Sequence, residues 1–154
     1  METVIVKMGE IHVTQGEFLL ETFGVGSCIA VILHDPEKNI AGMMHAMLTT
    51  DKATQTQMTT NPLRYVELAI PALVKEMTKA GASKQHLKAS IAGGAQMFTL
   101  YHDPSNAIGP KNVEAAKKAL NDAGIPIEYE DTGGTKGRNV RFELHTGKCV
   151  IETK

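Results

Sequence analysis

Cys28 and His45 are the two residues of this 154-residue chain whose types and spacing best support chemistry. A deprotonated thiol is a strong nucleophile, and a neutral imidazole can take the thiol proton and later return it to a leaving group. Both residues lie in short apolar runs, and a turn signal at residues 35–39 separates these runs. The pair predicts a cysteine hydrolase in which Cys28 attacks an amide carbonyl and His45 acts as its base.

Strand register decides whether these two side chains can meet. If residues 28–34 and 40–48 form a hairpin whose turn is centred between Pro36 and Glu37, Cys28 faces His45 directly. The same register pairs Ile32 with Ala41 and Asp35 with Lys38. Directly opposed residues in an antiparallel pair have Cβ atoms roughly 4.5–5.5 Å apart. A slip of one residue would instead turn the thiol and the imidazole to opposite faces of the hairpin.

The segment before Cys28 is rich in glycine and predicts a sharp bend. Successive N–H groups from Gly24, Gly26 and Ser27 could point into one concavity. Such donors would favour the thiolate and would stabilise the oxyanion that forms when sulfur adds to a carbonyl. A third group usually orients the base. The hydroxyl or the carbonyl of Thr22 is a candidate, although spacing alone does not select it.

Each of these residues also has a purely structural interpretation. Cysteine in an apolar run is often a small core side chain, and His45 could be a hydrogen-bonded core histidine. Gly93 and Gly94 could line a substrate cleft or simply form a turn. Cys149 is expected in the core, and the other histidines show no metal-ligand spacing. No cofactor and no metal site is therefore expected.

The elements that must position the pair are mainly strands, with two main helices. Alternating or apolar runs predict strands at residues 4–7, 10–14, 18–23, 28–34, 40–48, 87–92, 125–130, 139–145 and 148–152. Asn61-Pro62 predicts the start of a helix that closes at Gly81, with a kink at Pro71, and a second helix is expected over residues 110–123. Residues 49–60 read as a mobile polar loop. This order predicts an α+β layered sandwich with mostly antiparallel pairing.

Composition fits one domain over residues 1–154. Apolar residues make up 42% of the chain, charged residues 21%, and the formal charge is −1. This balance predicts neither nucleic-acid binding nor membrane insertion, and the N-terminus has no signal-peptide pattern. A cytoplasmic protein with two free thiols is expected.

Several blocks of sequence, spread over nearly the whole chain, carry a more specific signal. They are Gly24-Val25-Gly26-Ser27-Cys28-Ile29-Ala30-Val31, Gly42-Met43-Met44-His45-Ala46-Met47-Leu48, Ala92-Gly93-Gly94-Ala95-Gln96-Met97-Phe98, Ile108-Gly109-Pro110-Lys111-Asn112-Val113 and Asp131-Thr132-Gly133-Gly134-Thr135-Lys136-Gly137-Arg138-Asn139-Val140. In this order and spacing they resemble the CheD family of chemoreceptor glutamine deamidases.

The resemblance implies a protein-glutamine deamidase with Cys28 as nucleophile, His45 as base and Thr22 as the residue that orients the histidine. It implies a layered sandwich related to bacterial deamidating toxins, and a thioester route from receptor glutamine to glutamate with release of ammonia. Methylesterase activity and a CheC-type phosphatase partner are further implications. Thr49 and Lys111 stand where the family often has proline and arginine, and these departures concern loop geometry and partner contacts rather than the thiol and the imidazole.

Three functional classes therefore stay open from the residues alone. The first is a deamidase that acts on the cytoplasmic helices of chemoreceptors. The second is a non-catalytic adaptor that binds receptors or a phosphatase. The third is another cysteine amidohydrolase, such as a peptidase or a transamidase, because these reactions begin with the same thiol addition.

Overall fold

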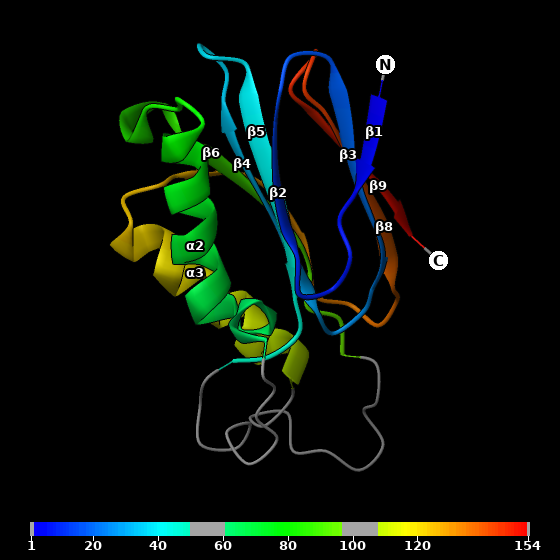
Figure 1. The fold of residues 1–154 in the computed structure, drawn as a ribbon. Coiled ribbons are helices and arrows are strands. Elements are labelled where there is room, and N and C mark those ends of the chain that lie inside the picture. The colour runs from blue at the N-terminus through cyan, green and yellow to red at the C-terminus, as the bar shows by residue number, and fades with distance from the viewer. Residues whose placement is uncertain (1, 50–60, 97–107, 154) are drawn as a thin grey trace.

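The computed structural model describes residues 2–49, 61–96 and 108–153, and it has three layers (Figure 1). A four-stranded sheet in the order β1-β3-β8-β9 packs against a five-stranded sheet in the order β2-β5-β4-β6-β7. Helices α2 and α3 cover the outer face of the five-stranded sheet. The expected α+β sandwich is confirmed, and among the strand pairs of the described residues only β1 with β3 and β6 with β7 are parallel.

The element bounds lie within a few residues of the expected ones. The strands are β1 (Glu2–Ile5), β2 (Ile11–Gln15), β3 (Phe18–Val25), β4 (Ile29–Asp35), β5 (Ile40–Ala46), β6 (Lys88–Gly93), β7 (Ile127–Thr132), β8 (Arg138–Glu143) and β9 (Lys148–Thr153). The helices are α2 (Val66–Lys79) and α3 (Ile108–Asp122), with short 3₁₀ turns η1 (Pro62–Arg64) and η2 (Lys84–His86). The polar loop expected over residues 49–60 lies, apart from Thr49, outside the described residues.

The first helix does not begin where the sequence predicts. Asn61 caps a 3₁₀ turn instead, and its side chain accepts a hydrogen bond from the Leu63 N–H. Tyr65 then has extended backbone angles, and α2 begins at Val66. Tyr65 is held in this conformation by a parallel bridge to Leu48, so a strand contact interrupts the predicted helix.

The register expected for the β4–β5 hairpin is wrong by two residues. His45 faces Ala30, Ile32 faces Met43, and Asp35 faces Ile40. The reason is the turn, which occupies residues 36–39 rather than two residues, and Asn39 has a left-handed φ of 55°. The Asp35 side chain stabilises this longer turn by accepting hydrogen bonds from the N–H groups of Glu37 and Lys38. Because the error is an even number, no side chain changes face.

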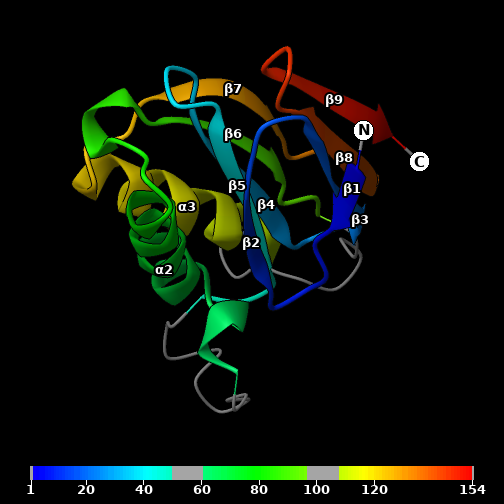
Figure 2. The ribbon, with the colours of Figure 1, turned by 45° about the horizontal axis from the view of Figure 1, so that its top comes forward.

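Two apolar cores follow from the alternation of side chains along β4 and β5. One face, including Val31, Leu33 and Met44, packs against α2 and α3. The other face, including Cys28, Ala30 and Met43, packs against the four-stranded sheet. Figure 2 shows the two sheets facing each other, on the side of the five-stranded sheet away from α2 and α3. Cys28 therefore lies in the layer between the sheets.

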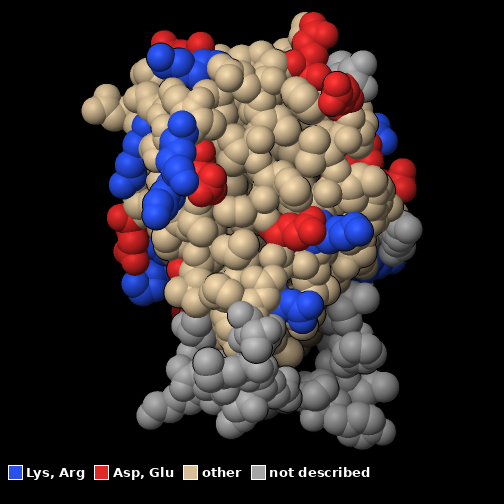
Figure 3. Space-filling model, viewed as in Figure 1, with Lys and Arg blue, Asp and Glu red and all other residues tan. Residues whose placement is uncertain are grey.

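The described surface carries charges of both signs. On the face that Figure 3 shows, basic side chains lie beside acidic ones rather than forming a single-sign area. No helix among residues 2–49, 61–96 and 108–153 combines the length and the apolar character that a bilayer crossing requires.

Candidate active site

The candidate site lies at the end of the sandwich where β4 begins and where β5 and β6 end. His45 comes from β5 and Cys28 precedes β4, both on the face directed at the four-stranded sheet. Thr22 comes from β3 in that opposing sheet. All three residues are buried, with exposures of 9% for Cys28, 3% for His45 and 0% for Thr22. Residues from both sheets thus meet in one small volume.

A hydrogen bond joins the two sheets at this point. Thr22 Oγ1 lies 2.8 Å from His45 Nδ1 and also 2.6 Å from the carbonyl oxygen of Val6. A hydroxyl has one hydrogen, and a carbonyl oxygen can only accept. Thr22 must therefore donate to Val6 and accept from the Nδ1–H of His45. The contact selects the hydroxyl, rather than the carbonyl, as the group of Thr22 that orients the ring.

This arrangement assigns the tautomer of His45. With the proton on Nδ1, Nε2 of the neutral ring carries a free lone pair. Nε2 is buried and has no hydrogen-bond partner among the described residues. Burial lowers the pKa of His45 to about 4, so the ring is neutral near pH 7. His45 is therefore a neutral imidazole with an unoccupied acceptor nitrogen, which is the form that can take a thiol proton.

Cys28 lies diagonally from His45 rather than directly opposite. Ala30 faces His45, and Cys28 is two residues earlier on the same face. Diagonal neighbours in a sheet are about 7–8 Å apart at the backbone, with Cβ atoms somewhat closer, which is within reach of a histidine ring. Burial raises the pKa of the Cys28 thiol, although a hydrogen bond from its own backbone N–H acts in the opposite direction. The expected thiolate is thus not favoured overall, and the resting pair consists of a neutral thiol and a neutral imidazole.

A β-bulge lies between Thr22 and the cysteine segment. The pairing of β3 with β8 shifts between Thr22 and Val25, so β3 contains one extra residue there. Gly24 in this bulge has a left-handed φ of 67°, and its N–H donates to Asn139 Oδ1 at 3.2 Å. Bulges bend a strand and redirect its side chains. The Gly24 amide is therefore used to fix the bulge.

Residues 26–28 form the bend that carries Cys28, here called the cysteine bend. Gly93 and Gly94 contact the backbone of this bend at the Cys28 carbonyl. The Gly94 N–H donates to the Cys28 carbonyl at 2.7 Å. A Cβ added to Gly93 would lie 2.4 Å from the same carbonyl oxygen, and the φ of Gly93 is 115°. Only glycine fits such an approach. The two residues support the cysteine bend, and Gly94 also borders a hollow of about 390 Å³ with Gly133.

Two buried polar residues at this end of the fold were not expected from the sequence. Arg138 is 7% exposed, and its guanidinium contacts Asp131 at 3.2 Å and the Gly133 carbonyl at 2.9 Å. Asn112 on α3 is fully buried and donates from Nδ2 to the Ser27 carbonyl at 2.8 Å. Both residues lie within the blocks that carried the family resemblance. No periodicity or spacing rule distinguishes them from surface residues.

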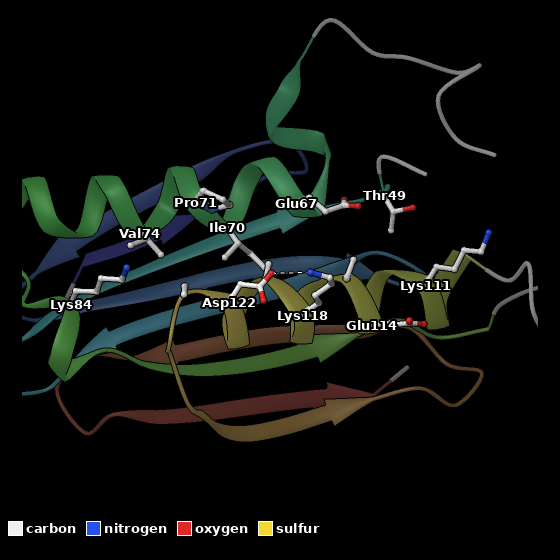
Figure 4. Close-up of a pocket in the computed structure, with 13 residues that line it drawn as sticks. Thr49, Glu67, Ile70, Pro71, Val74, Lys84, Lys111, Glu114, Lys118 and Asp122 are labelled. Carbon is white, nitrogen blue, oxygen red and sulfur yellow. Dashed lines mark hydrogen bonds and ion pairs between the residues drawn. The ribbon is translucent and has the colours of Figure 1, made fainter. Parts of the chain in front are cut away.

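A large cavity lies elsewhere, between α2 and α3 (Figure 4). Its volume is about 800 Å³, with an apolar floor that includes Ile70 and Val74. Lysines and acidic residues surround it, and Lys118 pairs with Asp122 at 2.9 Å. Neither Cys28 nor His45 lines it. Within the described ranges no group of three or more His, Cys, Asp or Glu side chains is arranged to hold a metal ion.

The two cysteines are both free thiols. Cys149 lies on β9 and is only partly buried, so it is less enclosed than expected. Burial and the nearby Asp131 raise its pKa to about 11. Cys149 pairs with Phe142 of β8 and packs against the same core between the sheets that contains Cys28.

Sequence comparisons agree on one family. The CheD family model, described as CheD chemotactic sensory transduction, matches residues 47–153. A protein of Clostridium novyi (strain NT) named "Probable chemoreceptor glutamine deamidase CheD" is 42% identical over 154 residues, which is 99% of this chain and 93% of that protein. A protein of the same name from Clostridium botulinum (strain Hall) is 41% identical over 155 residues, covering 99% of this chain and 94% of its own length. The relatives therefore span the region of Thr22, Cys28 and His45, which precedes the family-model match.

Proposed function

Because this chain belongs to the CheD family of chemotactic sensory transduction proteins, we propose that it is a chemoreceptor glutamine deamidase that uses Cys28 as its nucleophile. In this proposal His45 is the general base and Thr22 orients it. The substrate is a glutamine side chain on the cytoplasmic helices of a chemoreceptor, and the product is glutamate. A cytoplasmic location belongs to the same proposal.

The reaction begins with proton transfer within a neutral pair. As Cys28 Sγ adds to the glutamine Cδ, His45 Nε2 takes the thiol proton and an oxyanion forms on the carboxamide oxygen. When the carbonyl re-forms, the C–N bond breaks and His45 returns the proton to the departing ammonia. This leaves a γ-glutamyl thioester on Cys28. Water then adds with His45 as base, the C–S bond breaks, and glutamate and the free thiol are released.

The observation that carries the proposal is the contact of Thr22 Oγ1 with His45 Nδ1. It fixes the proton on the nitrogen remote from the reaction and leaves Nε2 free in the layer that holds Cys28. A core histidine with only a structural role normally has both ring nitrogens satisfied when buried. His34 Nε2 is also buried without a partner, so the support for a base comes from the location of His45, on the sheet face that also carries Cys28.

The direct test is incubation of the protein with receptor cytoplasmic fragments, followed by mass spectrometry of their glutamines. We expect conversion to glutamate with release of ammonia, and no conversion with Cys28→Ala. Conversion that persists in this variant would exclude Cys28 as nucleophile. New isopeptide cross-links without free ammonia would indicate a transamidase instead. Receptor binding without any conversion by the native protein would indicate an adaptor.

The same thioester chemistry extends to receptor glutamate methyl esters, because methanol replaces ammonia as the leaving group. We include this methylesterase activity in the proposal, with release of methanol from methylated receptor fragments as its test. A CheC-type phosphatase is the proposed regulatory partner. Its addition should lower the deamidation rate if it competes with the receptor for the same surface.

A further inference from the structure

Three successive carbonyls of the cysteine bend are each held by a donor from the β6 end or from α3. The Ala95 N–H donates to Gly26 at 2.9 Å, Asn112 Nδ2 to Ser27 at 2.8 Å, and the Gly94 N–H to Cys28 at 2.7 Å. These donors form one packed unit. A Cβ added to Gly109 at the start of α3 would lie 2.3 Å from the Ala95 carbonyl oxygen, so helix and loop are in direct contact.

Fixing these carbonyls also fixes the amides that follow them. In a trans peptide the C=O of one residue and the N–H of the next point in opposite directions, and the described chain contains no cis peptide bonds. The Ser27 N–H therefore points away from Ala95, and the Cys28 N–H points away from Asn112 of α3. Two adjacent N–H groups beside a nucleophile form the arrangement that stabilises an oxyanion.

Of the three donors, Asn112 alone donates from its side chain. Its contacts determine which way round the side-chain amide lies. Its second Nδ2 hydrogen bond goes to the Met47 carbonyl at 3.1 Å. Both acceptors are carbonyl oxygens, so a flipped amide would place Oδ1 against two acceptors. Met47 lies two residues after His45. The Asn112 amide thus connects the segment that carries the thiol to the segment that carries the imidazole.

We propose that Asn112 is a positioning residue for the deamidation proposed above, on which this inference rests. It holds the Ser27 carbonyl so that the Cys28 N–H faces the developing oxyanion, and through Met47 it keeps the cysteine bend in register with the end of β5. Asn112 itself does not touch the substrate. Its contribution is made in the transition state, where the oxyanion forms.

The test compares two variants of Asn112 with a control on the same helix. Asn112→Asp keeps the size of the side chain and Asn112→Leu removes its polarity, and both remove the amide donor. We expect kcat to fall about 10- to 100-fold, with KM nearly unchanged, because deleting a whole oxyanion donor costs roughly 10²–10³ in kcat and misplacing one costs less. Asn121→Ala, at an exposed position of α3, should leave kcat unchanged.

A second readout separates positioning from general damage. Alkylation of Cys28 by iodoacetamide is a displacement that forms no oxyanion, so its rate in the Asn112 variants should fall less than kcat does. Equal losses in alkylation and deamidation, or unchanged kcat in either folded variant, would overturn the proposal. Activity of the native protein is measured in parallel, so an inactive native protein counts against the proposed function and not against the role of Asn112.

A measurement on the native protein keeps the inference testable if both variants fail to fold. A peptide aldehyde derived from glutamine should add to Cys28 as a hemithioacetal, which places an oxygen where the oxyanion forms. The amide signals of Ser27 and Cys28 should then move downfield in the ¹H–¹⁵N spectrum, because each gains a hydrogen-bond acceptor. Adduct formation with both amide signals unmoved would show that these N–H groups do not face the reacting oxygen.

Discussion

Thr22 Oγ1 accepts a hydrogen bond from the Nδ1–H of His45 across the two sheets, at 2.8 Å, because its own hydrogen is donated to the Val6 carbonyl. One hydroxyl therefore sets both the tautomer and the orientation of the imidazole. The same contact places the base at a junction between β3 and β5, which are not neighbours in either sheet. Its loss should affect the reaction more than the fold.

Replacing Thr22 by valine should lower kcat/KM by about 10- to 100-fold. The substitution conserves shape but leaves the buried Nδ1–H without an acceptor, at a free-energy cost of about 1–3 kcal/mol. The ring can then turn or change tautomer, which removes the lone pair from Nε2. Steady-state kinetics measure the loss, and ¹⁵N chemical shifts of the imidazole report the tautomer. Thr22→Ser retains the hydroxyl and should stay within a few-fold of the native rate, whereas equal rates for Thr22→Val and the native protein would contradict this role.

The burial of neutral His45 should make the protein less stable in acid. Its pKa is about 4 when folded and about 6.5 when unfolded. Between these values the unfolded chain binds a proton at this position and the folded chain does not. The free energy of unfolding should therefore fall as pH decreases from about 6.5 to 4, by on the order of 3 kcal/mol when the whole interval is crossed.

Denaturant unfolding at a series of pH values measures this effect. The matched variant is His45→Gln, which does not titrate in the interval and should lose this part of the pH dependence. The other histidines contribute equally to the pH dependence of both proteins, so they cancel in the difference between the two free energies of unfolding. Parallel stability curves for the two proteins would show that His45 is not buried in its neutral form.

The thiol of Cys28 should titrate above its ordinary pKa, because burial outweighs the hydrogen bond from its own amide. In a Cys149→Ser background, the rate of alkylation should rise with pH through a midpoint above the ordinary value of about 8.5. The proposed catalysis at neutral pH then depends on proton transfer to His45 during attack rather than on a resting thiolate. A rate plateau already present at neutral pH would show a preformed thiolate–imidazolium pair.

Gly93→Ala should disrupt the cysteine bend and reduce both stability and deamidation. The new Cβ would lie 2.4 Å from the Cys28 carbonyl oxygen, in addition to the strain of a φ of 115°. Gly16→Ala is the matched control, since Gly16 has a φ of 95° but no heavy atom within 4 Å of the added Cβ. We expect the free energy of unfolding of the control to fall only by the cost of placing alanine at a left-handed φ, of the order of 1 kcal/mol. Its kcat should equal that of the native protein. Similar losses of kcat in both variants would show that the contact with Cys28 is unimportant.

Local patterns identified most of the elements. Short runs bounded by turn residues predicted β3, β4 and β5, the last two from their apolar composition, and the Gly124 stop predicted the end of α3. The register error arose in the turn, because Asp35 and Asn39 stabilise a four-residue loop that hydrophobic alternation does not reveal. The face occupied by Cys28 and His45 was nonetheless predicted correctly, since alternation has a period of two and the error was even.

The sequence by itself determined which side chains can do chemistry and where most of the strands lie along the chain. It also determined the face of the hairpin on which the thiol and the imidazole lie. Only the tertiary structure decided that the Thr22 hydroxyl reaches His45 from the opposite sheet, and that Asn112 reaches the cysteine bend from a helix 85 residues further along the chain. The physical reason is that each contact joins groups far apart in the sequence: two side chains for Thr22 and His45, and a side chain and a backbone carbonyl for Asn112 and Ser27. Such contacts depend on how the layers pack, which no local periodicity encodes.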